Sequence, residues 1–150
     1  MKRMLLALSL AVLTAAPLAA HAQFAKVEDA VKYRKSAFAV MGAHFGRIGA
    51  VVKGERPYDK TAVESDAAVV EFMSRLPWHA FPAGSGTADS KAKPEIWKEQ
   101  DKFKAGAEKM QGEVGKLSAA AKTGDLAAIK AAFGNTAQSC KACHDNYRNK

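Results

Sequence analysis

The sequence has few of the residues that mark several common protein classes. It contains only two cysteines, Cys140 and Cys143, which excludes a framework of several disulfide bonds. Aromatic residues make up 8% of the chain, and the 48% hydrophobic and 25% charged residues exclude a disordered or collagen-like protein. A length of 150 residues allows one domain of ordinary size.

The chain also lacks a long run of charge of one sign. Its 23 Lys and Arg residues outnumber its 15 Asp and Glu residues, which gives a formal charge of +8. Because the acidic residues are interleaved with the basic ones, a solvated surface explains this charge better than nucleic-acid binding does. The basic excess also suits weak docking of an acidic redox partner, which the sequence does not identify.

The first 22 residues have the features of a secretory signal peptide. A positive pair at residues 2–3 precedes an uncharged run at residues 4–20, and Ala20-His21-Ala22 is a small-x-small cleavage site. The alternative is a membrane-spanning helix, which needs about 20 apolar residues, and Pro17 interrupts the run. We therefore predict cleavage after Ala22, export to the periplasm, no stable membrane association and a mature domain at 23–150.

Hydrophobic periodicity predicts four amphipathic helices in the mature chain and no strand of comparable strength. The predicted helices cover about 27–52, 59–76, 94–121 and 126–147. Asp59 and Asp125 are expected as N-caps, and Pro94 as a first-turn residue. Pro and Gly residues mark a long loop at 77–93 between the second and third helices. This pattern predicts an all-α, antiparallel four-helix bundle with up-down-up-down topology.

The segment Cys140-Lys141-Ala142-Cys143-His144 has the C-x-x-C-H pattern of c-type haem attachment. On one helical turn, thiols at positions i and i+3 can reach the two vinyl groups at one haem edge. His144, four residues after Cys140, projects from the same face and can bind the iron. We predict one covalent haem c per chain, attached through Cys140 and Cys143, with His144 as an axial ligand.

Three haem-free interpretations of this motif are less consistent with its surroundings. A disulfide or thioredoxin-like pair has no need of His144 and normally begins a helix in a β-α-β unit. A zinc site requires a fourth ligand, for which only His44 or His79 is available. Free buried cysteines at this spacing are unusual in an oxidising compartment.

Residues 23–150 resemble the cytochromes c′, the class II c-type cytochromes. Besides the C-x-x-C-H motif, the segments that carry the resemblance are Phe24-Ala25-Lys26, Lys32-Tyr33-Arg34, Leu76-Pro77-Trp78 and Ala131-Ala132-Phe133-Gly134. The resemblance implies a five-coordinate haem iron that binds nitric oxide and carbon monoxide, a role in electron transfer rather than in enzymatic catalysis, and a homodimer formed through the first two helices.

The resemblance also implies roles for three haem-pocket residues. Arg34, the one charged residue in the apolar seam of the first helix, is expected to contact a haem propionate; otherwise it extends to solvent. Phe38, one turn later, is expected to cover the distal side of the iron, and it cannot ligate. Arg148, one turn after His144, is expected beside that ligand, although it also suits the negative end of the helix dipole.

Two further groups of residues leave alternatives open. Met41 lies three residues after Phe38, so a six-coordinate, low-spin iron with a methionine ligand is the main alternative to the five-coordinate one. Gly42, Gly46 and Gly49 form a strip on the first helix, where each costs about 1 kcal/mol relative to Ala, so either close helix packing or a dimer contact is expected.

Overall fold

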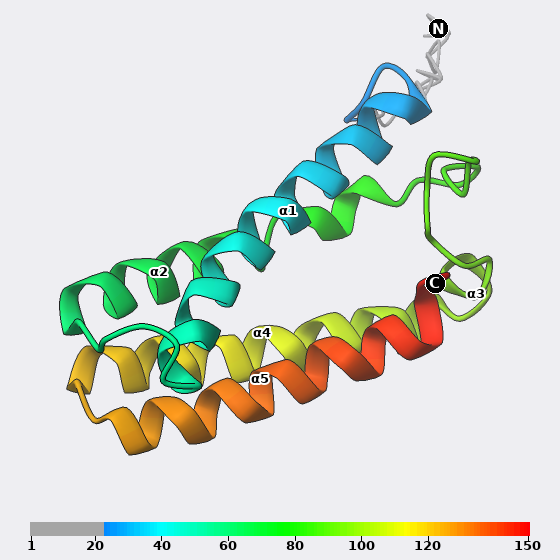
Figure 1. Ribbon diagram of the computed structural model, residues 1–150. Helices are drawn as coiled ribbons and strands as arrows, with labels where there is room; N and C mark the ends of the chain where they lie inside the picture. The colour runs from blue at the N-terminus through cyan, green and yellow to red at the C-terminus, as the bar shows by residue number, and fades with distance from the viewer. Residues whose placement is uncertain (1–22) are drawn as a thin grey trace, which may run out of the picture.

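The computed structural model describes residues 23–150, so the predicted signal peptide at 1–22 lies outside the described residues. The elements are α1 (Val27–Val52), α2 (Lys60–Met73), the 3₁₀ helix η1 (Pro77–Ala80), α3 (Glu95–Lys98), α4 (Gln100–Thr123) and α5 (Leu126–Tyr147). Four of these are long helices, which pack as a bundle (Figure 1). Within 23–150 the only β pairing is an isolated antiparallel bridge between Ala92 and Arg148. The predicted all-α bundle is confirmed.

The helix ends follow the capping chemistry of the sequence. The Asp59 carboxylate accepts a hydrogen bond from the Ala62 amide, and the Asp125 carboxylate accepts from the two amides after Leu126. Gly124, at φ 81°, ends α4 in the left-handed conformation that glycine adopts without steric cost. The predicted caps are therefore present.

One predicted helix is divided in two. Glu99 has φ −124° and ψ 48°, outside the helical region, so the helix expected from Pro94 onward becomes the short α3 followed by α4. The Trp97 indole of α3 donates hydrogen bonds to the carbonyls of Phe81 and Pro82, 3.1 and 3.0 Å away. The first turn is therefore oriented by the preceding loop, whereas α4 is oriented by its packing against α5 and α2.

Two hydrophobic clusters fill the bundle. The larger one joins α1, α2, α4 and α5, and its most buried side chains are Ile48, Val63, Val70, Val114, Leu117 and Ile129. The smaller one contains Ile96, Phe103 and Tyr147, with Trp78 and Phe81 packed against it. The smaller cluster lies toward the end of the bundle where α5 terminates.

Helices α1 and α5 approach each other closely around Gly49. A Cβ atom at Gly49 would lie 2.9 Å from Cζ of Phe133, whose ring stacks on Phe45 at a centroid distance of 4.3 Å. Gly42 and Gly46 have nothing within 4 Å of such an atom. Close packing therefore explains Gly49 but not the other two glycines. Toward the chain's C-terminal end the two helices diverge (Figure 1).

No helix within 23–150 is long and apolar enough to cross a membrane.

Candidate haem-binding site

The C-x-x-C-H motif lies on the last two turns of α5, between the two hydrophobic clusters. Cys140 packs against the larger cluster and Cys143 against the smaller one, and both thiols are free and half-buried. His144 follows on the same helix and is exposed. The predicted helical spacing of the two sulfurs and the imidazole is therefore present, with the thiols facing apolar surroundings.

The surroundings of the three side chains favour their neutral forms. Burial raises the pKa of the Cys140 thiol and of the Cys143 thiol. Although His144 is exposed as a residue, its ring is partly covered, and this partial loss of solvent lowers its pKa; the positive charge of Arg148 lowers it further. A neutral imidazole is the form that binds iron.

A continuous series of aromatic contacts connects α1 to the C-terminal end of α5. Phe38 of α1 meets the Trp78 ring edge-on, with the ring centroids 5.8 Å apart. Trp78 contacts Phe103 at 5.6 Å, and Phe103 contacts Tyr147 at 5.2 Å. We refer to the four rings of Phe38, Trp78, Phe103 and Tyr147 as the aromatic layer. Cys143 packs against the smaller cluster, which contains Phe103 and Tyr147. The aromatic layer therefore includes the residue predicted to cover the iron and adjoins one of the two predicted attachment thiols.

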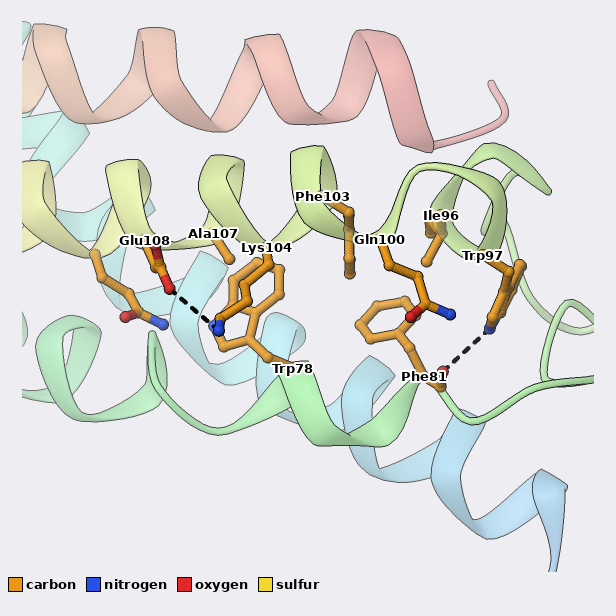
Figure 2. Close-up of a pocket in the computed structure, with 10 residues that line it drawn as sticks. Trp78, Phe81, Ile96, Trp97, Gln100, Phe103, Lys104, Ala107 and Glu108 are labelled. Carbon is orange, nitrogen blue, oxygen red and sulfur yellow. Dashed lines mark hydrogen bonds and ion pairs between the residues drawn. The ribbon is translucent and has the colours of Figure 1, made fainter.

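A cavity of about 400 Å³ lies between α3, α4 and η1. Figure 2 shows the rings of Trp78, Phe81 and Phe103 at its base and the Lys104–Glu108 ion pair at its rim. None of the three motif residues lines it. The cavity and the motif are therefore separate, and both adjoin the aromatic layer.

Arg34 is buried, with 3% of its surface exposed, so it does not extend to solvent. Nη1 donates to the Ala80 carbonyl at 2.7 Å and to Ser85 Oγ at 2.8 Å, and Nη2 donates to the Ser85 carbonyl at 2.5 Å and to Ser90 Oγ at 2.7 Å. The guanidinium also lies 4.4 Å from the centroid of the Phe81 ring. These loop partners are not apparent from the sequence, because two of the four acceptors are backbone carbonyls.

The Arg34 charge has only neutral partners within the described part of the chain, where no acidic side chain forms an ion pair with it. Burial lowers its pKa, but a guanidinium stays protonated in proteins. A buried charge without a counter-ion is costly. The position therefore favours a neighbouring group that carries a carboxylate.

Arg148 and His144 line the same open hollow of about 480 Å³, together with Lys93, Asp145 and Lys150. The Arg148 backbone amide donates to the His144 carbonyl at 3.0 Å and so caps α5. Both interpretations of Arg148, as a neighbour of His144 and as a cation at the helix end, agree with this position.

The other candidate ligands have contacts of their own. Met41 packs against the larger hydrophobic cluster. His44 Nδ1 lies 2.8 Å from Asp66 Oδ1, and His79 stacks on Phe24 at 5.9 Å. Among residues 23–150 no three His, Cys, Asp or Glu side chains are grouped to hold a metal ion, so neither imidazole completes the zinc site considered from the sequence.

The residues present are suited to haem c. Two free thiols one turn apart suit covalent attachment, and the adjacent imidazole suits iron ligation. The aromatic layer suits a large apolar ring, and the buried Arg34 suits a carboxylate. The chemistry of this donor set therefore matches the predicted cofactor.

Comparison with known proteins supports the same conclusion. The sequence model of the cytochrome C' family matches residues 29–148. Cytochrome c' of Alcaligenes xylosoxydans xylosoxydans is 52% identical over 128 residues, which cover 85% of this chain and 99% of that protein. The crystal structure of cytochrome c' from Rubrivivax gelatinosus has a TM-score of 0.81 at 44% identity, covering 85% of this chain and all of that one.

A further similar structure carries a ligand. It is the nitric oxide complex of a mutant of cytochrome c prime from Alcaligenes xylosoxidans, with a TM-score of 0.80 at 49% identity. The match covers 85% of this chain and 99% of that one.

Proposed function

The chain belongs to the cytochrome c′ family, and on this basis we propose that it is a periplasmic monohaem cytochrome that transfers electrons and binds nitric oxide and carbon monoxide at a five-coordinate iron. The observation that carries the proposal is the C-x-x-C-H motif on α5, beside an aromatic layer whose α1 member is a phenylalanine. Bound haem supplies one-electron redox chemistry and an iron that takes small gases.

Five side chains of the proposed site have assigned roles. Cys140 and Cys143 hold the cofactor covalently on α5, and His144 ligates the iron on the proximal side. Arg34 supplies a positive charge for a haem carboxylate, and Arg148 supplies one beside His144. No residue of the site is given a role as a catalytic acid or base, so the proposed function is not enzymatic.

Phe38 determines the expected ligand chemistry. Its ring has no atom that ligates iron, and it offers no hydrogen bond to a bound ligand. Dioxygen needs polar stabilisation because negative charge develops on it when it binds ferrous iron, whereas nitric oxide and carbon monoxide depend on such donors much less. We expect a ferrous protein that is high-spin, binds both gases and forms no stable dioxygen complex.

The deciding experiment compares wild type with Phe38→Ala. The absorption spectrum of reduced wild type should be high-spin, and stopped-flow mixing with carbon monoxide should show faster binding to the mutant because a steric barrier is removed. Lys32→Ala, an exposed position on the same helix, is the control and should leave the rate unchanged. Equal rates in Phe38→Ala and wild type would mean that Phe38 does not cover the iron.

The same spectrum tests the main alternative. A low-spin wild-type spectrum that becomes high-spin in Met41→Leu would identify Met41 as a second axial ligand. Met41 packs against the same larger cluster as Cys140, so the spectrum, rather than this packing, separates an iron ligand from a structural residue. Intact-mass measurement of protein purified from the periplasm should give residues 23–150 plus one haem, which tests both signal cleavage and stoichiometry.

We also propose that two copies of the chain pair through α1 and α2. The support is apolar surface left exposed on these helices: Phe72 of α2 is 66% exposed and Val40 of α1 is 41% exposed. Among residues 23–150, no atom lies close enough to Gly42 or Gly46 to explain their small size. A second copy would cover this surface and account for both glycines.

A further inference from the structure

The long loop between η1 and α3, residues 81–93, is fixed to both helices that flank the proposed haem. We refer to these residues as the strap. At one end the strap meets α1, and at the other it meets the C-terminal end of α5, crossing the side on which the two helices diverge (Figure 1). The hydrogen bonds of the strap connect the helices there, in addition to the aromatic contacts from Phe38 through Trp78 and Phe103 to Tyr147.

The α1 end is held mainly by Arg34. Three of its four hydrogen bonds go to strap atoms, on Ser85 and Ser90, and the fourth goes to the Ala80 carbonyl just before the strap. Ser85 is fully buried, so its bonds to Arg34 are shielded from water. A second contact, from Lys35 Nζ to the Asp89 carbonyl at 3.2 Å, is exposed and therefore weak.

The α5 end is held by backbone pairing. The Lys93 amide donates to the Tyr147 carbonyl at 2.9 Å, and the Asn149 amide donates to the Lys91 carbonyl at 2.8 Å. The isolated bridge between Ala92 and Arg148 is part of the same pairing. The strap thus ends in a short antiparallel ladder with the residues that follow α5.

Each anchor lies one helical turn from a residue of the proposed site. Phe38 follows Arg34 by four residues on α1, and His144 of α5 precedes Arg148, the C-cap of that helix, by four residues. Direct packing of α1 on α5 occurs at Gly49, about four turns from Arg34 along the helix. At the Arg34 end, the separation of the two helices therefore depends on the strap as well as on the aromatic rings between them.

We propose that Arg34 is a positioning residue that fixes the strap to α1 and thereby sets the distance between Phe38 and the His144 face of α5. This inference rests on the proposed function for its effect on the iron, but the connection between Arg34 and the strap stands on its own contacts. This positioning role differs from a purely electrostatic one. A lysine at position 34 would keep the positive charge but lose the hydrogen bonds that the two terminal nitrogens of the guanidinium donate.

Amide hydrogen exchange of the purified protein tests the connection. Arg34→Lys should speed exchange of the Ser85, Ser90 and Lys93 amides by about ten-fold or more, because loss of charge-assisted hydrogen bonds favours local opening. The Ser85→Ala/Ser90→Ala double variant should act in the same direction while keeping the guanidinium, and remains informative if Arg34→Lys folds poorly. Lys35→Ala, which removes only the exposed contact, is the control and should match wild type.

Carbon monoxide binding to the same reduced proteins tests the positioning role. Arg34→Lys and the Ser85→Ala/Ser90→Ala double variant should both bind carbon monoxide faster than wild type. The haem potential should be nearly unchanged in both, because the positive charge at position 34 is retained. Unchanged exchange in both variants would overturn the connection between Arg34 and the strap. Faster exchange with an unchanged binding rate would overturn the positioning role. The wild-type spectrum reports separately on whether the proposed function holds.

Discussion

Replacement of Gly49 by alanine tests whether α1 and α5 are in contact as tightly as the structure indicates. The added Cβ would lie 2.9 Å from Cζ of Phe133, closer than carbon atoms pack. The Phe133 ring cannot move away freely, because Phe45 stacks on it at 4.3 Å. Overpacking of this kind costs about 1–3 kcal/mol, whereas alanine gains about 1 kcal/mol over glycine in a helix.

The net effect expected for Gly49→Ala is a loss of up to about 2 kcal/mol in the free energy of unfolding. Gly112→Ala is the matched control, because Gly112 is an exposed position inside α4 with nothing within 4 Å, and it should gain up to about 1 kcal/mol. Thermal unfolding followed by circular dichroism should separate the two variants by several degrees, at roughly 3–6 °C per kcal/mol.

A second substitution identifies the cause. In the background of Phe133→Leu, whose side chain is smaller and can shift, Gly49→Ala should destabilise less than it does in wild type, so the double-mutant cycle should show coupling between the two positions. If Gly49→Ala stabilises the protein as much as Gly112→Ala does, α1 and α5 do not meet at Gly49 and the reasoning is refuted.

Two further predictions concern the face formed by α1 and α2. Burial alone would raise the pKa of Asp66, but hydrogen bonds from Arg47 and His44 outweigh burial and lower this pKa. The ionised carboxylate therefore stabilises the folded protein at pH values above the pKa of Asp66 in the unfolded chain, about 4. This stabilisation is lost as the pH falls through the lower pKa of Asp66 in the folded protein. Asp66→Asn should therefore cost roughly 1–3 kcal/mol at pH 7 and much less near pH 3 in urea unfolding, and an equal cost at both pH values would contradict this account. Phe72→Asp should convert the dimer to monomer in sedimentation velocity, while Ala119→Asp at an exposed position on α4 should not. A dimer that survives Phe72→Asp would place the interface elsewhere.

The parts of the fold that local chemistry determines were predictable from the sequence. Apolar periodicity predicts the long helices, and the Asp59 and Asp125 caps depend on atoms within three residues of each other. The break at Glu99 was not predictable, because it follows from contacts between Trp97 and carbonyls about 15 residues earlier in the chain. Neither the hydrophobic pattern nor the residue type at Glu99 carries that information.

The glycine strip shows the same limit at the level of single residues. Gly42, Gly46 and Gly49 have similar helical surroundings in the sequence, and the sequence gives no means of separating close packing from a dimer contact. The distinction depends on whether a bulky side chain of another helix lies opposite each one. Phe133 lies opposite Gly49 only, because α1 and α5 converge at that end of the bundle and diverge at the other.

Arg34 illustrates what a charged residue in an apolar seam does and does not predict. Its position requires a polar partner, because an isolated buried guanidinium is too costly, and that much follows from the sequence. The identity of the partner does not follow, since two of its four hydrogen-bond acceptors are carbonyls, which every residue carries. The carboxylate of a cofactor and the neutral oxygens of a loop are not exclusive, because hydrogen bonds satisfy the donors of the guanidinium while only an anion neutralises its charge. A residue that holds the strap can therefore also supply the positive charge that a haem carboxylate requires.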